Sequence, residues 1–263
     1  MEESVTKADM LTYVFIFETF FLVLTRVTAF FAYAPFLGGT SVPTTVKVGL
    51  SFLTSVSIYP LLNFQGFQTA MDLVAFTALI FREVLIGLAL GFVCNMIFEA
   101  IKLAGSVFDM QVGFGIVSVV DPEADTEVSI MAIFKYFVAL IAFIGCDGYH
   151  ILIYALGRSF REIGVGEFFS MGAMSGILTR QFSSMVEIGF QISLPMMGSI
   201  LLATVVLGIM AKATPRVQVF LLSFPLRIYV GLVTVMALLP ALISYFFQLF
   251  EKMGQDMVEV MKV

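Results

Sequence analysis

Charged side chains interrupt several long apolar segments of this 263-residue chain, and they are the residues best able to carry chemistry. Each costs roughly 2.5 to 3.5 kcal/mol at the centre of a membrane helix, so we expect it to face protein or water. These charges could form a proton or ion relay, or buried pairs between helices or subunits. Because they are scattered instead of converging on one site, pairs are favoured over a relay. The charges are Glu18, Arg26, Arg82, Glu83, Lys135, Asp147, Glu187 and Arg227.

Two short spacings predict contacts made by single helices. Glu99 and Lys102 are three residues apart, so they can form an ion pair on one helix face. Gly87 and Gly91 form a G-x-x-x-G step, which lets a second helix approach closely. Both spacings are typical of helix packing.

The residues that most enzymes need are scarce. The chain has one histidine, His150, and its two cysteines, Cys94 and Cys146, fit neither a disulfide framework nor a metal-ligand spacing. No phosphate-binding loop occurs, and the net charge of -5 comes without a basic cluster for nucleic acid. We therefore expect no enzyme activity, no catalytic residues, no metal, no cofactor and no nucleic-acid partner.

The stretch from Gly105 to Glu127 differs from its apolar surroundings. It contains three glycines, the polar residues Asp109 and Gln111, and an acidic end. One interpretation is an ordinary loop in water. The other is irregular backbone that lines or blocks a pore, because non-helical backbone at membrane depth occurs only inside protein or beside a water-filled cavity.

The elements that position these residues are predicted to be membrane-type helices. The chain is 60% hydrophobic and 13% charged, whereas soluble domains are nearer half apolar and a quarter charged. Continuous apolar runs without strict alternation predict an all-α fold. Prolines inside the last two runs favour kinks in long helical hairpins. The runs are Met10 to Leu37, Val46 to Leu62, Leu73 to Ile101, Val128 to Gly157, Ile177 to Met210 and Val217 to Phe250.

Five segments, taken in their order along the chain, resemble one family. They read SVPTTVKVGLSFLTSVSIYP, REVLIGLALGF, AGSVFDMQVGFGIVSVVDP, SLPMM and ATPRVQVFLLSFPLRIYVGL. On these segments the chain resembles the FliR family of type III secretion export-gate proteins, called SctT or SpaR in the injectisome branch. The glycine-rich central pattern is closer to the flagellar branch.

The resemblance implies a subunit of a larger assembly in the bacterial inner membrane, at the core of the secretion basal body. The expected partners are FliP-type and FliQ-type subunits, an FlhB-type subunit, and unfolded export substrates. The fold is expected to be one helical domain over 1–263 that is similar to FliP-type and FliQ-type subunits fused end to end. The FliP-like part covers 1 to about 170, including the 105–127 loop, and the FliQ-like hairpin covers about 171 to 263.

The resemblance also implies two groups of site residues. The 105–122 segment is similar to the family's plug, which closes a gated conduit from within; its residues are Gly105, Asp109, Met110, Gln111, Gly113, Phe114, Gly115, Ile116, Val117, Asp121 and Pro122. Helix packing or subunit interfaces are expected at Pro43, Lys47, Arg82, Glu83, Gly87, Gly91, Glu187, Pro195, Pro215, Pro225 and Arg227.

Two other function classes stay open on the residues alone. A stand-alone secondary transporter or channel for a small solute would use Glu18, Arg82, Glu83 and Glu187 to line its path. A purely structural membrane scaffold would use the same charges only for packing.

Overall fold

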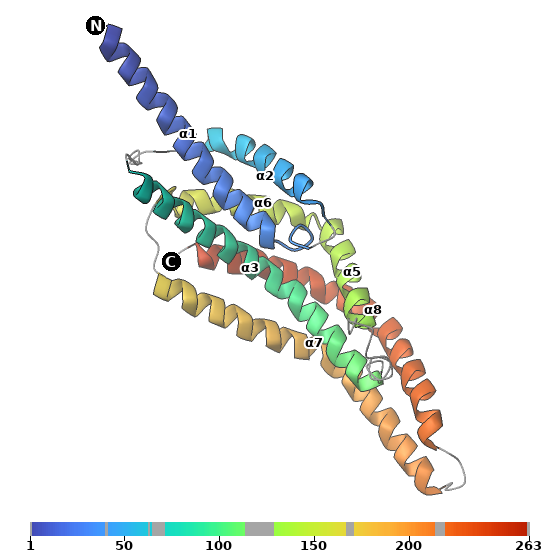
Figure 1. The fold of residues 1–263 in the computed structure, drawn as a ribbon. Helices are drawn as coiled ribbons and strands as arrows, with labels where there is room; N and C mark the ends of the chain where they lie inside the picture. Colours follow the sequence, from blue (N-terminus) through green and yellow to red (C-terminus); the bar gives the residue numbers. More distant parts are fainter. Residues whose placement is uncertain are drawn as a thin grey trace, which may run out of the picture. The chain divides into compact units, whose positions relative to one another are not determined.

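The protein is all-helical over the residues that its structure describes, as the apolar runs predict. In the computed structural model these residues are 2–39, 42–62, 64, 72–113, 129–166, 171–213 and 219–261, and no strand occurs among them. Figure 1 shows the helices in chain order: α1 (Glu2–Tyr33), α2 (Thr44–Ile58), the short 3-10 helix η1 (Tyr59–Leu61), α3 (Leu73–Val112), α5 (Ile130–Gly145), α6 (Gly148–Glu162), α7 (Met171–Ala213) and α8 (Val219–Val260).

Four of these helices are long and apolar enough to cross a membrane, and a fifth crossing results if α5 and α6 form one broken span. The candidate spans are Thr12–Tyr33, Leu73–Val112, Met174–Ala213 and Ser223–Val260. Helix α2 has only 15 residues, fewer than the roughly 20 that a straight crossing needs.

The apolar run predicted from Val128 to Gly157 holds two helices over its described residues, α5 and the first part of α6. The break falls at Cys146 and Asp147, and Asp147 has a left-handed backbone with φ 55°. Asp tolerates this conformation better than most residues. Asp147 is exposed in this break, between two helices.

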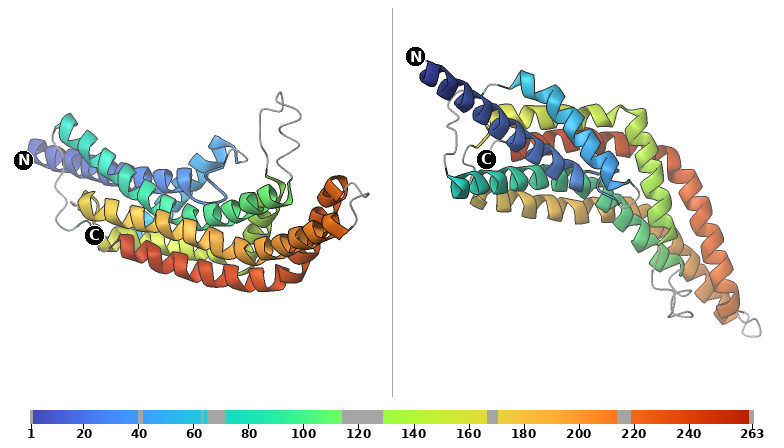
Figure 2. Two further views of the ribbon diagram at one scale, coloured as in Figure 1. Left: turned by 90° about the horizontal axis from the view of Figure 1, so that it is seen from below. Right: turned by 45° about the horizontal axis from the view of Figure 1, so that its top comes forward.

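Residue contacts divide the chain into two units, and α3, α7 and α8 each contribute residues to both. The first unit comprises Met1–Asn95, Tyr149–Arg180 and Lys252–Val263. Within it, α2 runs beside α1 (Figures 1 and 2), and Phe20 packs edge-on against Phe52 and Tyr59.

The second unit comprises Met96–Gly148 and Gln181–Glu251. Its parts of α7 and α8 lie side by side and antiparallel (Figure 2), joined by hydrogen bonds from Thr234 to Ser199 and from Tyr245 to Gln191, each 3.0 Å long. Pro195, inside α7, and Pro225 and Pro240, inside α8, leave these helices continuous. Each proline removes one main-chain donor from its helix.

Candidate functional site

Asp109, near the end of α3, binds the start of α5. Its Oδ2 atom accepts hydrogen bonds from the Ser129 hydroxyl at 2.6 Å and from the Met131 main-chain nitrogen at 3.0 Å. The Ser129 hydroxyl also accepts a 3.2 Å bond from the Ala132 nitrogen, so the two side chains together cap the helix. A carboxylate at a helix N-terminus is further stabilised by the helix dipole. Asp109 therefore fixes the beginning of α5 against α3.

Gly105 brings the same two helices into close contact. A Cβ atom added at Gly105 would lie 2.2 Å from the Ala132 Cα, a distance that no side chain tolerates. The prediction of irregular backbone from Gly105 onward is therefore wrong for residues 105–112, which continue α3. Gly105 allows close packing of α3 with α5, and Asp109 caps the start of α5.

Lys135 of α5 completes this contact from the opposite helix. Its side chain is buried, and its ammonium donates a 3.0 Å hydrogen bond to the main-chain oxygen of Ala104. The ammonium also lies 5.5 Å from the centre of the Phe108 ring, within cation–π range. The sequence predicts that the Lys135 charge faces protein or water, and in the structure it faces protein. It links α5 to the last turns of α3.

The predicted plug residues therefore separate into four groups. Gly105 and Asp109 are buried at the contact of α3 with α5, whereas Met110 and Gln111 are exposed on the last turn of α3. Gly113 follows the helix with φ 95°, a backbone conformation that favours glycine. The remaining predicted plug residues lie outside the described residues: Phe114, Gly115, Ile116, Val117, Asp121 and Pro122.

A second charged cluster joins α1, α3 and α6 in the first unit. Arg26 and Glu83 form an ion pair whose shortest N–O distance is 2.5 Å, and both side chains are fully buried. The guanidinium also donates to the main-chain oxygens of Ser159 and Ile163 at 3.1 and 3.0 Å. It lies 4.3 Å from the centre of the Phe160 ring. The pair is a structural connection among three helices.

Both carboxylate oxygens of Glu83 accept hydrogen bonds from described groups. Its Oε2 accepts from the Arg26 Nε, and its Oε1 accepts from the Arg26 Nη2 at 3.2 Å and from the Gly166 nitrogen at 3.0 Å. Glu187 belongs to the other unit, where it is exposed and accepts a hydrogen bond from Gln191. The Arg26–Glu83 pair thus fulfils the expectation of buried pairs.

The G-x-x-x-G step of α3 lies directly against α1. A Cβ added at Gly87 would lie 2.4 Å from the Arg26 main-chain oxygen, and one at Gly91 would lie 2.9 Å from the Phe30 oxygen. These two glycines let α1 approach closely enough for Arg26 to reach Glu83. The predicted Glu99–Lys102 ion pair also forms, with an N–O distance of 2.5 Å.

The other residues predicted at interfaces occupy varied positions. Pro43 precedes α2, and the Lys47 ammonium donates to the main-chain oxygens of Gly38 and Gly39, which closes the turn before that helix. Arg82 is half-buried, and its guanidinium donates a long, 3.5 Å hydrogen bond to the Gly166 oxygen.

In the second unit, Pro195 and Pro225 are exposed within their helices, and Arg227 is half-buried with its Nε lacking a partner among the described residues. Pro215 lies outside the described part of the chain.

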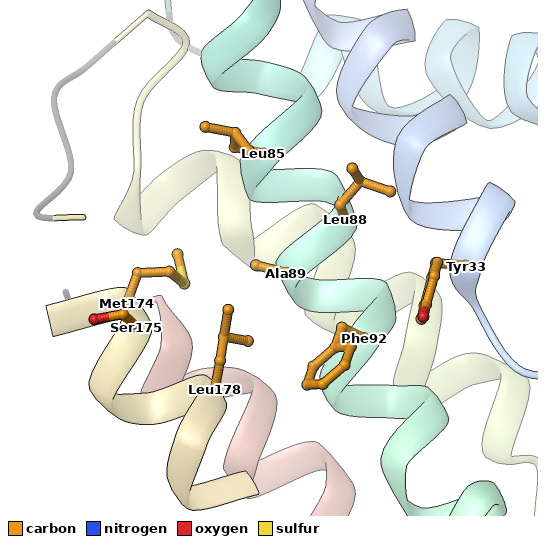
Figure 3. A pocket seen from close by; sticks show the side chains of 8 residues that line it. All are labelled: Tyr33, Leu85, Leu88, Ala89, Phe92, Met174, Ser175 and Leu178. Atoms are coloured by element: carbon orange, nitrogen blue, oxygen red, sulfur yellow. The ribbon is translucent and has the colours of Figure 1, made fainter. Parts of the chain in front are cut away.

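An apolar cavity of about 360 Å³ opens between α1, α3 and α7 in the first unit (Figure 3). No charged side chain lines it, and its polar side-chain groups are two hydroxyls. The lining residues are Tyr33, Leu85, Leu88, Ala89, Phe92, Met174, Ser175 and Leu178. Such a cavity offers neither a nucleophile with a base nor a metal ligand set. Among the described residues, no group of three or more His, Cys, Asp or Glu side chains could hold a metal ion.

Sequence reasoning did not identify Ser129 or Ser159, although both contact the charged clusters. A signal existed for Ser129, because a serine immediately before a long apolar run is a typical helix N-cap. Ser159 accepts from Arg26 through its main-chain oxygen at 3.1 Å, which any residue would supply, and through its hydroxyl at 3.5 Å. A lone serine in an apolar run gives no sequence signal for this contact.

The fold and these clusters define a class: an all-helical protein with several candidate membrane spans, whose buried charges hold helices together. Residues 17–253 match the model of the family described as bacterial export proteins, family 1. The chain belongs to this family, and within it to the flagellar, FliR, branch.

The relatives extend over nearly the full chain. The flagellar biosynthetic protein FliR of Bacillus subtilis (strain 168) is 31% identical, over 83% of this chain and 85% of its own length. FliR of Escherichia coli (strain K12) is 28% identical over 92% of both chains. FliR of Aquifex aeolicus (strain VF5) is 24% identical, over 93% of this chain and 95% of its own. These relatives are named as flagellar biosynthetic proteins and not as enzymes, and the chain is accordingly a component of flagellar protein export.

Proposed function

We propose that this protein is a subunit of the type III export gate of the bacterial flagellum, in the inner membrane at the core of the basal body. With FliP-type, FliQ-type and FlhB-type subunits it forms a gated conduit for unfolded export substrates. The observation that carries the proposal is the family match over residues 17–253. Four or five candidate membrane spans support the inner-membrane location.

The exposed apolar surface of α7 and α8 supports assembly with other helical subunits. Only 28% and 22% of the most apolar parts of these helices are buried in the single chain, compared with 67% for α3. Leu201, Leu202 and Met236 are 66%, 67% and 75% exposed. Lipid or neighbouring helices must cover this surface. We assign it to the FliQ-like hairpin, about 171 to 263, packing on partner subunits, and assign residues 1 to about 170 to the FliP-like part.

The 105–122 segment is proposed as the plug of the conduit. In this proposal Asp109 and Gly105 anchor its helical beginning to α5, and Gly113 lets the chain leave the helix. Phe114, Ile116 and Val117 supply the apolar bulk, because hydrophobic constrictions resist the passage of water and ions.

The mass of the native complex tests this proposal. A tagged copy of the chain is purified from its own membranes in mild detergent, and the intact particle is weighed by native mass spectrometry. We expect one copy of this chain together with several copies of two smaller helical proteins. A monomer or a simple homo-oligomer would refute the export-gate proposal and return attention to a stand-alone transporter.

A further inference from the structure

A second cavity, of about 300 Å³, lies in the first unit between the end of α2 with η1 and one face of α6. One of its walls is apolar and is formed by Ile58, Leu61 and Leu62. The other wall belongs to α6 and carries Arg158 and Arg161. We propose that this cavity docks a peptide segment of another protein, in which a carboxylate binds the two arginines and a neighbouring apolar side chain packs on the apolar wall. The inference goes beyond the proposed function, because it holds whichever proteins form the gate with this chain.

The two arginines have donors available for a carboxylate. They lie three residues apart on α6, so their side chains share one helix face. Arg161 is exposed and forms no ion pair in the described part of the chain. Arg158 donates from its Nε to Glu162 at 3.1 Å, and its two terminal nitrogens donate to no described group. Guanidinium groups bind carboxylates through paired donors, so this wall of the cavity is complementary to an acidic side chain.

Gly157 also lines the cavity, and helix packing does not require a glycine there. A Cβ atom added at Gly157 would meet no neighbouring atom within 4 Å, whereas one at Gly87 or Gly105 would meet the main chain of another helix. The backbone of Gly157 is helical, and glycine inside a helix lowers stability relative to alanine. Gly157 therefore weakens α6 without improving its packing, and its effect is to leave room in the cavity for a ligand.

The residue types around the cavity favour a protein ligand over a free anion. Tyr154 and Leu61 line the cavity and are 68% and 70% exposed. Tyrosine and arginine are enriched among the residues that contribute most to protein–protein binding. An inorganic anion would use the arginines alone, whereas a peptide would also cover the exposed apolar wall. The volume is at the lower end of the roughly 300–1,000 Å³ typical of ligand pockets, so it suits one or two side chains of a partner.

The end of α6 that carries the arginines is held in place by the buried ion pair. Arg26 donates to the main-chain oxygens of Ser159 and Ile163 at 3.1 and 3.0 Å. Arg26 is itself fixed by Glu83. The arginine wall is therefore positioned before a ligand arrives, which lowers the ordering cost of binding.

Site-specific photo-crosslinking in intact cells tests this inference. The photoreactive amino acid p-benzoylphenylalanine replaces Tyr154, an exposed aromatic residue of the cavity, and the cross-linked peptide is identified by mass spectrometry. We expect one segment of one partner protein, with an aspartate or glutamate close to the cross-linked position. Replacing that acid by arginine should lower the yield of cross-linking, and combining this change with Arg161→Glu should restore it.

Three single substitutions in this chain should change the yield in different directions. Arg161→Gln should lower it about 1.5-fold to fivefold, the range for loss of one exposed ion pair. Glu162→Gln should raise it, because the Glu162 carboxylate opposes a bound acid and occupies the Arg158 Nε. Gly157→Leu should abolish it by filling the cavity. Gly49→Leu is the matched control, because Gly49 of α2 has equally open surroundings and does not line the cavity.

Several results would overturn the inference. A phospholipid adduct, or a cross-linked segment without an acid, would assign the cavity to a different ligand. A yield unchanged in Arg161→Gln and Gly157→Leu, or lowered equally in Gly49→Leu, would show that the cavity is not the docking site, and so would the absence of any protein adduct. Because cross-linking precedes extraction from the membrane, its outcome is separate from the native mass of the complex. A monomer in that measurement, together with an acid-dependent cross-link, would refute the export gate and retain the docking site.

Discussion

Removing Arg26 should destabilise the protein far more than removing an equally short but exposed ion pair. The Arg26–Glu83 and Arg180–Glu259 pairs have the same shortest N–O distance, 2.5 Å. The side chains of the first pair are 0% exposed, whereas those of the second are 65% and 43% exposed. The comparison therefore varies burial while the contact distance stays the same.

The expected magnitudes follow from what each substitution leaves behind. Arg26→Met leaves the buried Glu83 carboxylate with the Gly166 N–H as its described donor, and loss of one member of a buried pair costs about 3–5 kcal/mol. Arg180→Met breaks an exposed pair, for which about 0.2–1 kcal/mol is typical. The double variant Arg26→Met with Glu83→Leu removes both charges, and it should be more stable than Arg26→Met alone because no unpaired charge stays buried.

The assay is the free energy of unfolding in mixed micelles, obtained by titration with sodium dodecyl sulfate and followed by the helical circular dichroism signal. A double-mutant cycle on each pair gives the two coupling energies. If Arg26→Met costs no more than Arg180→Met, or if the double variant is the least stable of the set, the argument that burial decides the contribution of the pair is wrong.

Three further predictions concern helix contacts and the plug. Gly87→Ala should lower the free energy of unfolding by about 1–3 kcal/mol because its methyl group meets α1, whereas Gly198→Ala in α7, with open space around it, should raise stability by up to about 1 kcal/mol; equal effects in the same micelle titration would refute the packing role. Asp109→Ala should cost about 0.5–2 kcal/mol through loss of the α5 cap, and a neutral result would contradict the cap. Deletion of residues 113–119 should leave the complex assembled but permeable to small ions in a liposome efflux assay, and a tight deleted complex would refute the plug.

The sequence predicts the helices well because their existence depends on the length of apolar runs. It predicts the end of α3 poorly because the residues there have two possible uses. Glycine and aspartate favour turns in isolation, but Gly105 lies against Ala132 and Asp109 binds Met131. These contacts join residues more than 20 positions apart, and local propensity carries no information about them.

The charged residues show a similar division between what the sequence reveals and what it does not. The cost of burying a charge predicts that Arg26 needs a partner, and the G-x-x-x-G step predicts that some helix approaches α3 closely. Which acid pairs with Arg26 depends on how the helices are arranged. Glu18 and Glu83 are both acids in apolar runs, and neither residue type nor spacing distinguishes them.

The Arg26–Glu83 pair has a consequence for the order of events during synthesis. The two residues are 57 positions apart, and the Ser159 oxygen that Arg26 also binds follows 133 positions after the arginine. At about 5–20 residues per second, the ribosome needs about 3–11 s after making Arg26 to make Glu83. During that interval α1 either inserts into the membrane with Arg26 unpaired or remains outside it. The Arg26 charge in α1 therefore gains its buried partner only after α3 has been synthesised.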